Sequence, residues 1–128
     1  MCALGNNKAE VLTALISGEE GFLTLDNELP LEEAQYVGRV TLPQSAALAE
    51  ITTHNNKLAY LAYQQIAEAL TVLVQQYGEH RIAVVIGTST ASIYEGELAR
   101  KALANDGEFP NDFHYQVQEM SAPATYIA

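Results

Sequence analysis

The segment Gly87–Ala91, with the sequence GTSTA, places a serine in a turn that could support nucleophilic chemistry. It follows an apolar run and nearly fits the G-x-S-x-G pattern, in which a serine nucleophile lies between a strand and a helix. Asp106 or Asp112, and then His114, follow Ser89 in the chain order of α/β hydrolases. That fold requires many parallel strands, more than this chain can supply. The alternative interpretation is a tight joint between a strand and a helix.

The other groups that could hold a metal or attack a substrate are isolated in the sequence. His54, His80 and His114 are far apart, and no pair has the spacing of a zinc motif. Cys2 is the only cysteine, so it offers no disulfide partner and is expected to pack rather than react. No lysine follows Gly87 at the position of a phosphate-binding loop. The residues alone therefore predict no metal, no cofactor and no catalytic constellation.

Composition and charge narrow the class of protein. The 128 residues include 16 acidic and 6 basic side chains, which gives a net charge of −10. The basic residues are scattered, whereas phosphate binding needs clustered Lys and Arg, so nucleic acid is not an expected partner. No apolar run reaches the roughly 18 residues of a membrane span, and the N-terminus lacks the pattern of a signal peptide. We expect a globular cytoplasmic protein.

The first part of the chain is predicted to form one helix and short extended segments. Residues 6–18 have helical apolar spacing, with Asn6 or Asn7 as the N-cap and Gly18 as the stop. Residues 21–26 are predicted to form a short strand, and residues 36–42 another strand or an extended surface segment, with a polar connection between them. Residues 43–51 are predicted to be a loop or a short helical turn.

The clearest predicted element is one long, largely buried helix over residues 54–78, because apolar side chains recur at helical spacing. Residues 81–87, RIAVVIG, are apolar on both faces, which is typical of an interior strand in a helix-covered sheet. A second helix is predicted over residues 92–106. A third is predicted from His114, with Asp112 as a candidate cap and Pro123 as a bend or an end.

An interior strand needs a neighbour on each edge, and the sequence does not visibly supply both. We therefore expect this chain to be a piece of a larger sheet. In isolation, the open edges predict oligomers or aggregation.

Four stretches, taken in order, resemble the β-ketoacyl-acyl carrier protein synthases, which are ketosynthases of the thiolase-like superfamily. They cover nearly the whole chain, and their order and approximate gaps agree with that family. The stretches are LGNNKAEVLTALISGEEGF, HNNKLAYLAYQQIAEAL, RIAVVIGTSTASIYEGE and FHYQVQEMSAPATYIA. The resemblance implies an α/β fold, the incomplete N-terminal half of a thiolase-like fold with helices packed on a partial sheet. It also implies a single partial domain over residues 1–128.

The resemblance places the catalytic residues of the family outside these residues. The first strand of the family would precede Leu4, and its nucleophilic cysteine and two histidines would follow Ala128. Cys2 is not at the position of the nucleophile, and the turn after Ile86 contains fewer glycines than is usual. No catalytic residue of the family can therefore be assigned in this chain.

The family condenses an acyl group, held on its cysteine, with a malonyl thioester in fatty-acid or polyketide biosynthesis. The resemblance implies an inactive synthase fragment, acyl carrier protein as a partner of the intact enzyme, and a homo- or hetero-oligomer. Tyr115, Met120 and Tyr126 are candidates for lining the acyl channel or the dimer interface. Two alternatives stay open: a non-catalytic ketosynthase-like interaction subunit, and a small α/β hydrolase that uses Ser89.

Overall fold

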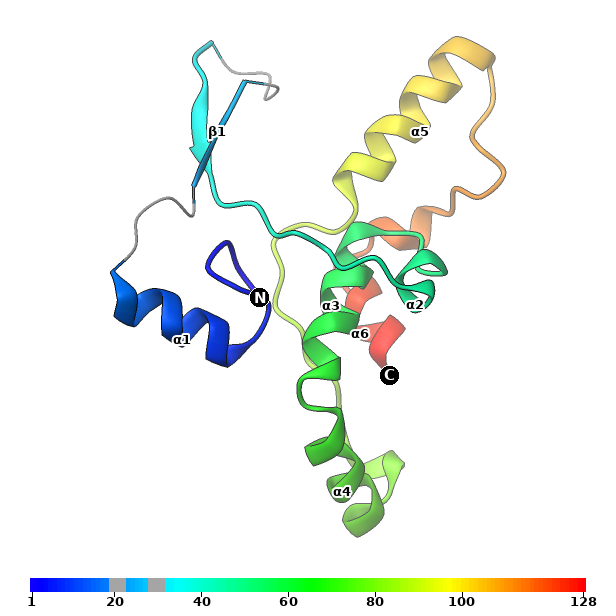
Figure 1. Cartoon of the computed structure of the whole chain (residues 1–128). Coiled ribbons are helices and arrows are strands. Elements are labelled where there is room, and N and C mark those ends of the chain that lie inside the picture. Colours follow the sequence, from blue (N-terminus) through cyan, green and yellow to red (C-terminus); the bar gives the residue numbers. More distant parts are fainter. Residues whose placement is uncertain (19–22, 28–31) are drawn as a thin grey trace. The chain divides into compact units, whose positions relative to one another are not determined.

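The computed structural model describes residues 1–18, 23–27 and 32–128, which form two compact units (Figure 1). Unit 1 is Met1–Gln44 and unit 2 is Ser45–Ala128. Within the described residues, no helix combines the length and the apolar character needed to cross a membrane. The prediction of a single partial domain over residues 1–128 stays a prediction.

Helix α1 of unit 1, Lys8–Ser17, begins and ends where the sequence predicts. The Asn7 side chain accepts a hydrogen bond from Glu10 N at 3.0 Å, and Glu10 Oε2 accepts one from Asn6 N at 2.7 Å. These bonds satisfy amide groups that a helix N-terminus leaves without partners. Gly18 ends the helix with φ 62°, a left-handed conformation that glycine adopts without strain. No residue of α1 is buried, so its stability depends on these local caps.

Asn7→Ala should destabilise α1 by about 1 kcal/mol, the typical cost of losing an N-cap side chain. The expected result is faster hydrogen exchange of the α1 amides and a loss of helical circular dichroism. Lys8→Ala is the matched control, because it changes an exposed neighbour and leaves the cap in place. Equal loss of protection in both variants would show that the cap does not stabilise α1.

The sheet of unit 1 consists of two antiparallel strands among the described residues. Strand β1, Thr24–Asp26, pairs with β2, Gln35–Val37, with Leu25 opposite Tyr36. The strand predicted over residues 21–26 is confirmed for its last three residues, and residues 21 and 22 lie outside the described part. The strand predicted over residues 36–42 ends at Val37. The polar connection between them lies partly outside the described residues, at 28–31.

Asp26 anchors the end of β1. Its side chain is almost fully buried and forms an ion pair with Arg39, whose own side chain is mostly exposed. The ion pair joins the end of β1 to the chain that follows β2, and so fixes the hairpin on one side.

In unit 2, the single long helix predicted over residues 54–78 is wrong. The structure has α3, His54–Gln64, and α4, Ala67–Tyr77, with a break at Ile66, where ψ is 1°. Gln65 N and Ile66 N bond to the carbonyls of Ala62 and Tyr63, three residues back, which tightens and closes the end of α3. The prediction that this region is largely buried is also wrong, because neither helix contains a buried residue.

Short helical segments lead into and out of these helices. The predicted turn over residues 43–51 is α2, Ala46–Ala49, capped by the Ser45 side chain. Thr53 caps α3 in the same way, accepting from Asn56 N at 3.3 Å. After α4, the short 3₁₀ helix η1, Glu79–Arg81, reverses the chain.

Residues 82–88 follow η1 without forming a strand. Exposure alternates with a period of two, which is typical of extended chain: Ile82, Val84 and Ile86 are half-buried, whereas Val85 is 90% exposed. The predicted interior strand is therefore corrected. The chain has the side-chain pattern of a strand, but no described residue pairs with its backbone.

Helix α5, Ile93–Asp106, confirms the helix predicted over residues 92–106, and Gly107 ends it with φ 81°. The helix predicted from His114 is instead two short elements. The 3₁₀ helix η2 is Tyr115–Gln118, and α6 is Ala122–Ile127. Pro123 lies in the first turn of α6, where its missing amide costs nothing, so it starts the helix rather than bending it.

The core of unit 2 is small. Its buried apolar side chains are Leu48, Ile51, Ala91, Ala99 and Pro123. Helices α3 and α6 pack against each other, and α5 packs on η2 (Figure 1). Because alanine buries little surface, most of the apolar burial in this core comes from Leu48, Ile51 and Pro123.

Candidate functional site

An apolar groove of about 580 Å³ lies in unit 2 between α3, the start of α4, the extended segment 82–88 and α6. Its floor includes Leu58, Ala59 and Ala62 from α3, and Pro123 and Ile127 reach it from α6. The small alanine side chains let the extended segment approach the helix. The polar groups in the lining are the amide of Asn55 and the hydroxyls of Tyr63 and Thr88, so the groove has no charged side chain. It can bury apolar surface, and Tyr63 is the one side chain among the described residues of its lining that is of a type that commonly transfers protons.

The turn after this segment is held by hydrogen bonds to the start of α3. Asn55 Nδ2 donates to Thr90 O at 3.1 Å, and Thr88 Oγ1 donates to the same carbonyl at 2.6 Å. Glu95 Oε1, in the first turn of α5, accepts from His54 N at 2.9 Å. These bonds join the turn, α3 and α5, as expected for a structural joint between packed elements.

A second cavity of about 450 Å³ lies beside this joint, where α5 begins. Its lining includes Lys57 and Glu95, of opposite charge, together with His54 and Ser92. Ser92 is buried and has φ 48°, a left-handed conformation that is uncommon for serine. It occupies the N-cap position of α5, but its side chain does not cap the helix.

The structure does not assemble the predicted serine hydrolase site. Ser89 is exposed in the turn and, within the described part of the chain, makes no hydrogen bond with any of the three histidines. Asp106 is exposed at the end of α5. Asp112 and His114 line a separate, third cavity whose lining does not include Ser89. The Ser89 hydrolase hypothesis therefore receives no support from the geometry.

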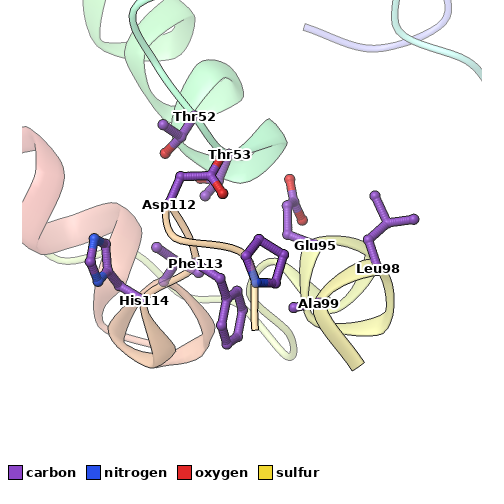
Figure 2. A pocket seen from close by; sticks show the side chains of 10 residues that line it. Thr52, Thr53, Glu95, Leu98, Ala99, Asp112, Phe113 and His114 are labelled. Atoms are coloured by element: carbon purple, nitrogen blue, oxygen red, sulfur yellow. The ribbon is translucent and has the colours of Figure 1, made fainter. Parts of the chain in front are cut away.

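The third cavity, of about 240 Å³, is lined by residues of α5, by Thr52 and Thr53 before α3, and by residues within 110–117 after α5 (Figure 2). Figure 2 shows the Asp112 side chain extending toward Thr52 and Thr53, while the His114 ring lies across the cavity from Glu95. Phe113 packs against Phe109 with ring centroids 5.4 Å apart. The titratable side chains do not converge on one point. We therefore interpret the cavity as part of the packing around the loop before η2.

The remaining candidate for nucleophilic chemistry, Cys2, is in unit 1. It is exposed, and its backbone forms two hydrogen bonds with Gly5, at 3.0 and 3.1 Å. Among the residues that the structure describes, no three potential metal ligands of the His, Cys, Asp and Glu types come together.

The side chains predicted to line an acyl channel or a dimer interface are exposed. Tyr115 is 72% exposed, Met120 63% and Tyr126 43%. From α6, the groove is lined instead by Pro123 and Ile127. Helical spacing could have suggested Ile127 together with Pro123, since the two lie four residues apart on one face. A role for Tyr115, Met120 and Tyr126 in a channel or interface stays a prediction.

Comparison with known proteins identifies the fold. No protein-family model and no curated protein matches the chain. Among solved structures, the whole chain superposes on part of a thiolase-like protein, so the chain has a partial fold of that α/β class. The match is to a chain in the structure of a ketosynthase (ApeO) in complex with its chain length factor (ApeC) from Xenorhabdus doucetiae.

The match has a TM-score of 0.73 and 26% sequence identity, and covers 100% of this chain but 34% of the other. The 128 residues therefore span about a third of that chain. The ketosynthase-like fold and the partial coverage of that fold agree with the expectations from sequence.

Proposed function

We propose that this chain is the scaffold segment of a β-ketoacyl synthase, and that its residues position an active site without performing the condensation. The observation that carries the proposal is the superposition of the whole chain on a chain of the ApeO–ApeC complex. In the proposed enzyme, acyl and malonyl thioesters are condensed in fatty-acid or polyketide biosynthesis, and acyl carrier protein delivers them. We place the enzyme in the cytoplasm.

The side-chain chemistry of the chain supports a structural role. Covalent acyl transfer needs a nucleophile with a base in hydrogen-bond reach and donors for the oxyanion. Cys2 is exposed, and in the described structure it forms hydrogen bonds through its backbone with Gly5 and none with His54, His80 or His114. Ser89 lacks a hydrogen bond to any of these histidines in the described structure. The groove, in turn, is lined by uncharged side chains.

A second candidate function is a non-catalytic ketosynthase-like subunit that binds a complete synthase. The matched structure supports this candidate function, because it contains a ketosynthase in complex with a second protein, its chain length factor. In both proposals this chain supplies fold and contact surface rather than reacting groups.

The acylation state of the chain tests the proposal. After incubation with a hexanoyl N-acetylcysteamine thioester, intact mass spectrometry should show no acyl adduct on any serine. Ester hydrolysis by the chain should equal the rate of the Ser89→Ala variant. Exposed Cys2 can exchange thioesters non-specifically, so the assay is run in parallel with Cys2→Ser.

An acyl adduct on Ser89, or ester hydrolysis that Ser89→Ala abolishes, would replace the scaffold proposal with the hydrolase. An adduct that disappears in Cys2→Ser but forms faster than with free cysteine would show that Cys2 is an activated nucleophile, which also contradicts the proposal.

A further inference from the structure

The second cavity, of about 450 Å³ at the start of α5, contains backbone amides that have no acceptor. Residues 92–95 all line it. The amides of residues 93–95 donate to no acceptor in the described part of the chain, and the first backbone bond of α5 is from Gly96 N to Ser92 O, at 3.1 Å. The free amides at the start of a helix carry a partial positive charge. The cavity is therefore bordered by the electropositive end of a 14-residue helix.

Ser92 adds a buried hydroxyl to the lining of this cavity. Ser92 is 3% exposed, and its side chain forms no hydrogen bond within the described residues. A serine at this position usually caps its own helix from an extended backbone, whereas Ser92 has φ 48° and ψ 38°. Residues other than glycine rarely adopt this conformation, and those that do are concentrated at functional sites. Since this chain itself removes Ser92 from water, its hydroxyl needs an acceptor within the cavity.

Lys57 supplies a positive charge to the same cavity. It lies near the start of α3, lines the cavity, and forms no ion pair with any residue that the structure describes. The acidic residue of the lining, Glu95, is already bound, because its Oε1 accepts from His54 N at 2.9 Å. The charges of Lys57 and Glu95 cancel, so an anion of charge −1 fits this cavity better than a phosphate dianion does.

We propose that this cavity binds a small carboxylate anion. One carboxylate oxygen accepts from the Ser92 hydroxyl and from the first amides of α5, and the other pairs with the Lys57 ammonium group. Hydrogen bonds to an ionised acceptor are stronger than those between neutral groups, and helix N-termini commonly bind anions in proteins. This inference is independent of the proposed function, since it depends on these donors and not on acyl chemistry.

Titration of the isotope-labelled chain with sodium acetate, followed by nuclear magnetic resonance, tests the site. The amide resonances of residues 93–95 should shift and reach saturation, and sodium chloride at equal ionic strength should not reproduce this. Lys57→Gln should weaken acetate binding by about tenfold, the typical effect of losing a hydrogen bond to a charged group. Lys8→Gln, at an exposed lysine of unit 1, is the matched control and should leave the affinity for acetate unchanged.

Ser92→Gly separates a binding role of this residue from a structural one. Glycine adopts the left-handed conformation without strain, so the variant should fold, which urea unfolding checks. Because the variant lacks the hydroxyl, its affinity for acetate should nevertheless fall. Acetate shifts that spread over the surface without saturation, or an unchanged affinity in either Lys57→Gln or Ser92→Gly, would overturn the proposal.

Discussion

Leu48→Ala should lower the free energy of unfolding of unit 2 by about 2–5 kcal/mol, the range for truncating a buried leucine. Leu48 is 4% exposed and lies in the four-residue helix α2. The other buried apolar residues of unit 2 are Ile51, Ala91, Ala99 and Pro123, so few large side chains can share the burial. Since small domains are stable by only about 5–15 kcal/mol, the loss should appear as a large shift of the urea midpoint.

Leu73→Ala is the matched control for this prediction. It makes the same substitution in α4, where Leu73 is 44% exposed, and should shift the midpoint far less. Equal shifts for the two variants would mean that the burial of Leu48 does not stabilise unit 2. A comparable shift for Ile51→Ala would support the small core described here, because Ile51 is the other large side chain in it.

Gly96→Val should displace the Gln118 side chain from α5 and destabilise unit 2 by about 1 kcal/mol, the low end of the usual cost of overpacking, because the contact is with the far end of a flexible side chain. Gly96 is buried in α5, and a Cβ at this position would overlap Gln118 Nε2 and lie 2.7 Å from Gln118 Cδ. Valine adds two further methyl groups, so the Gln118 side chain has to leave its site. The measurement is urea unfolding, followed by circular dichroism.

The cause is tested by removing the side chain that would clash. In a Gln118→Ala background, Gly96→Val should cost much less, so the two substitutions should not be additive. Helix propensity cannot cause this cost, because valine has a higher intrinsic helix propensity than glycine. Additive effects of Gly96→Val and Gln118→Ala on the free energy of unfolding would show that the destabilisation does not come from this contact.

The sequence predicts the elements whose ends are set by nearby residues. The cap at Asn7, the stop at Gly18 and the helix that ends before Gly107 involve bonds within a few residues, which local patterns record. The break at Ile66 could not be predicted in this way, because helical apolar spacing continues through it without glycine or proline. Similarly, the apolar pattern of residues 81–87 predicts burial on both faces, but burial depends on neighbours that the pattern does not identify.

For the candidate site, sequence correctly indicated a small-residue joint after Ile86 but not its partners. The hydrogen bond from Asn55 to Thr90 links residues 35 positions apart, and the composition of the turn alone cannot reveal such a contact. The family resemblance makes Tyr115, Met120 and Tyr126 candidates for lining an acyl channel or a dimer interface, and this stays a prediction. The apolar groove itself is lined by Pro123 and Ile127 of the same region. Which residues of α6 line the groove depends on the face of α6 that packs on α3, and tertiary packing sets that face.

The central claim is that unit 2 holds the helices and the extended segment of a partial ketosynthase-like fold around an apolar groove. The most direct measurement is nuclear magnetic resonance of the isotope-labelled chain, with methyl contacts observed around the groove. We expect extended chemical shifts for residues 82–88, contacts from Ile82 and Ile86 to Leu58 or Leu70, and contacts from Ile127 to α3. Helical shifts over residues 82–88, or the absence of contacts between that segment and α3, would contradict it.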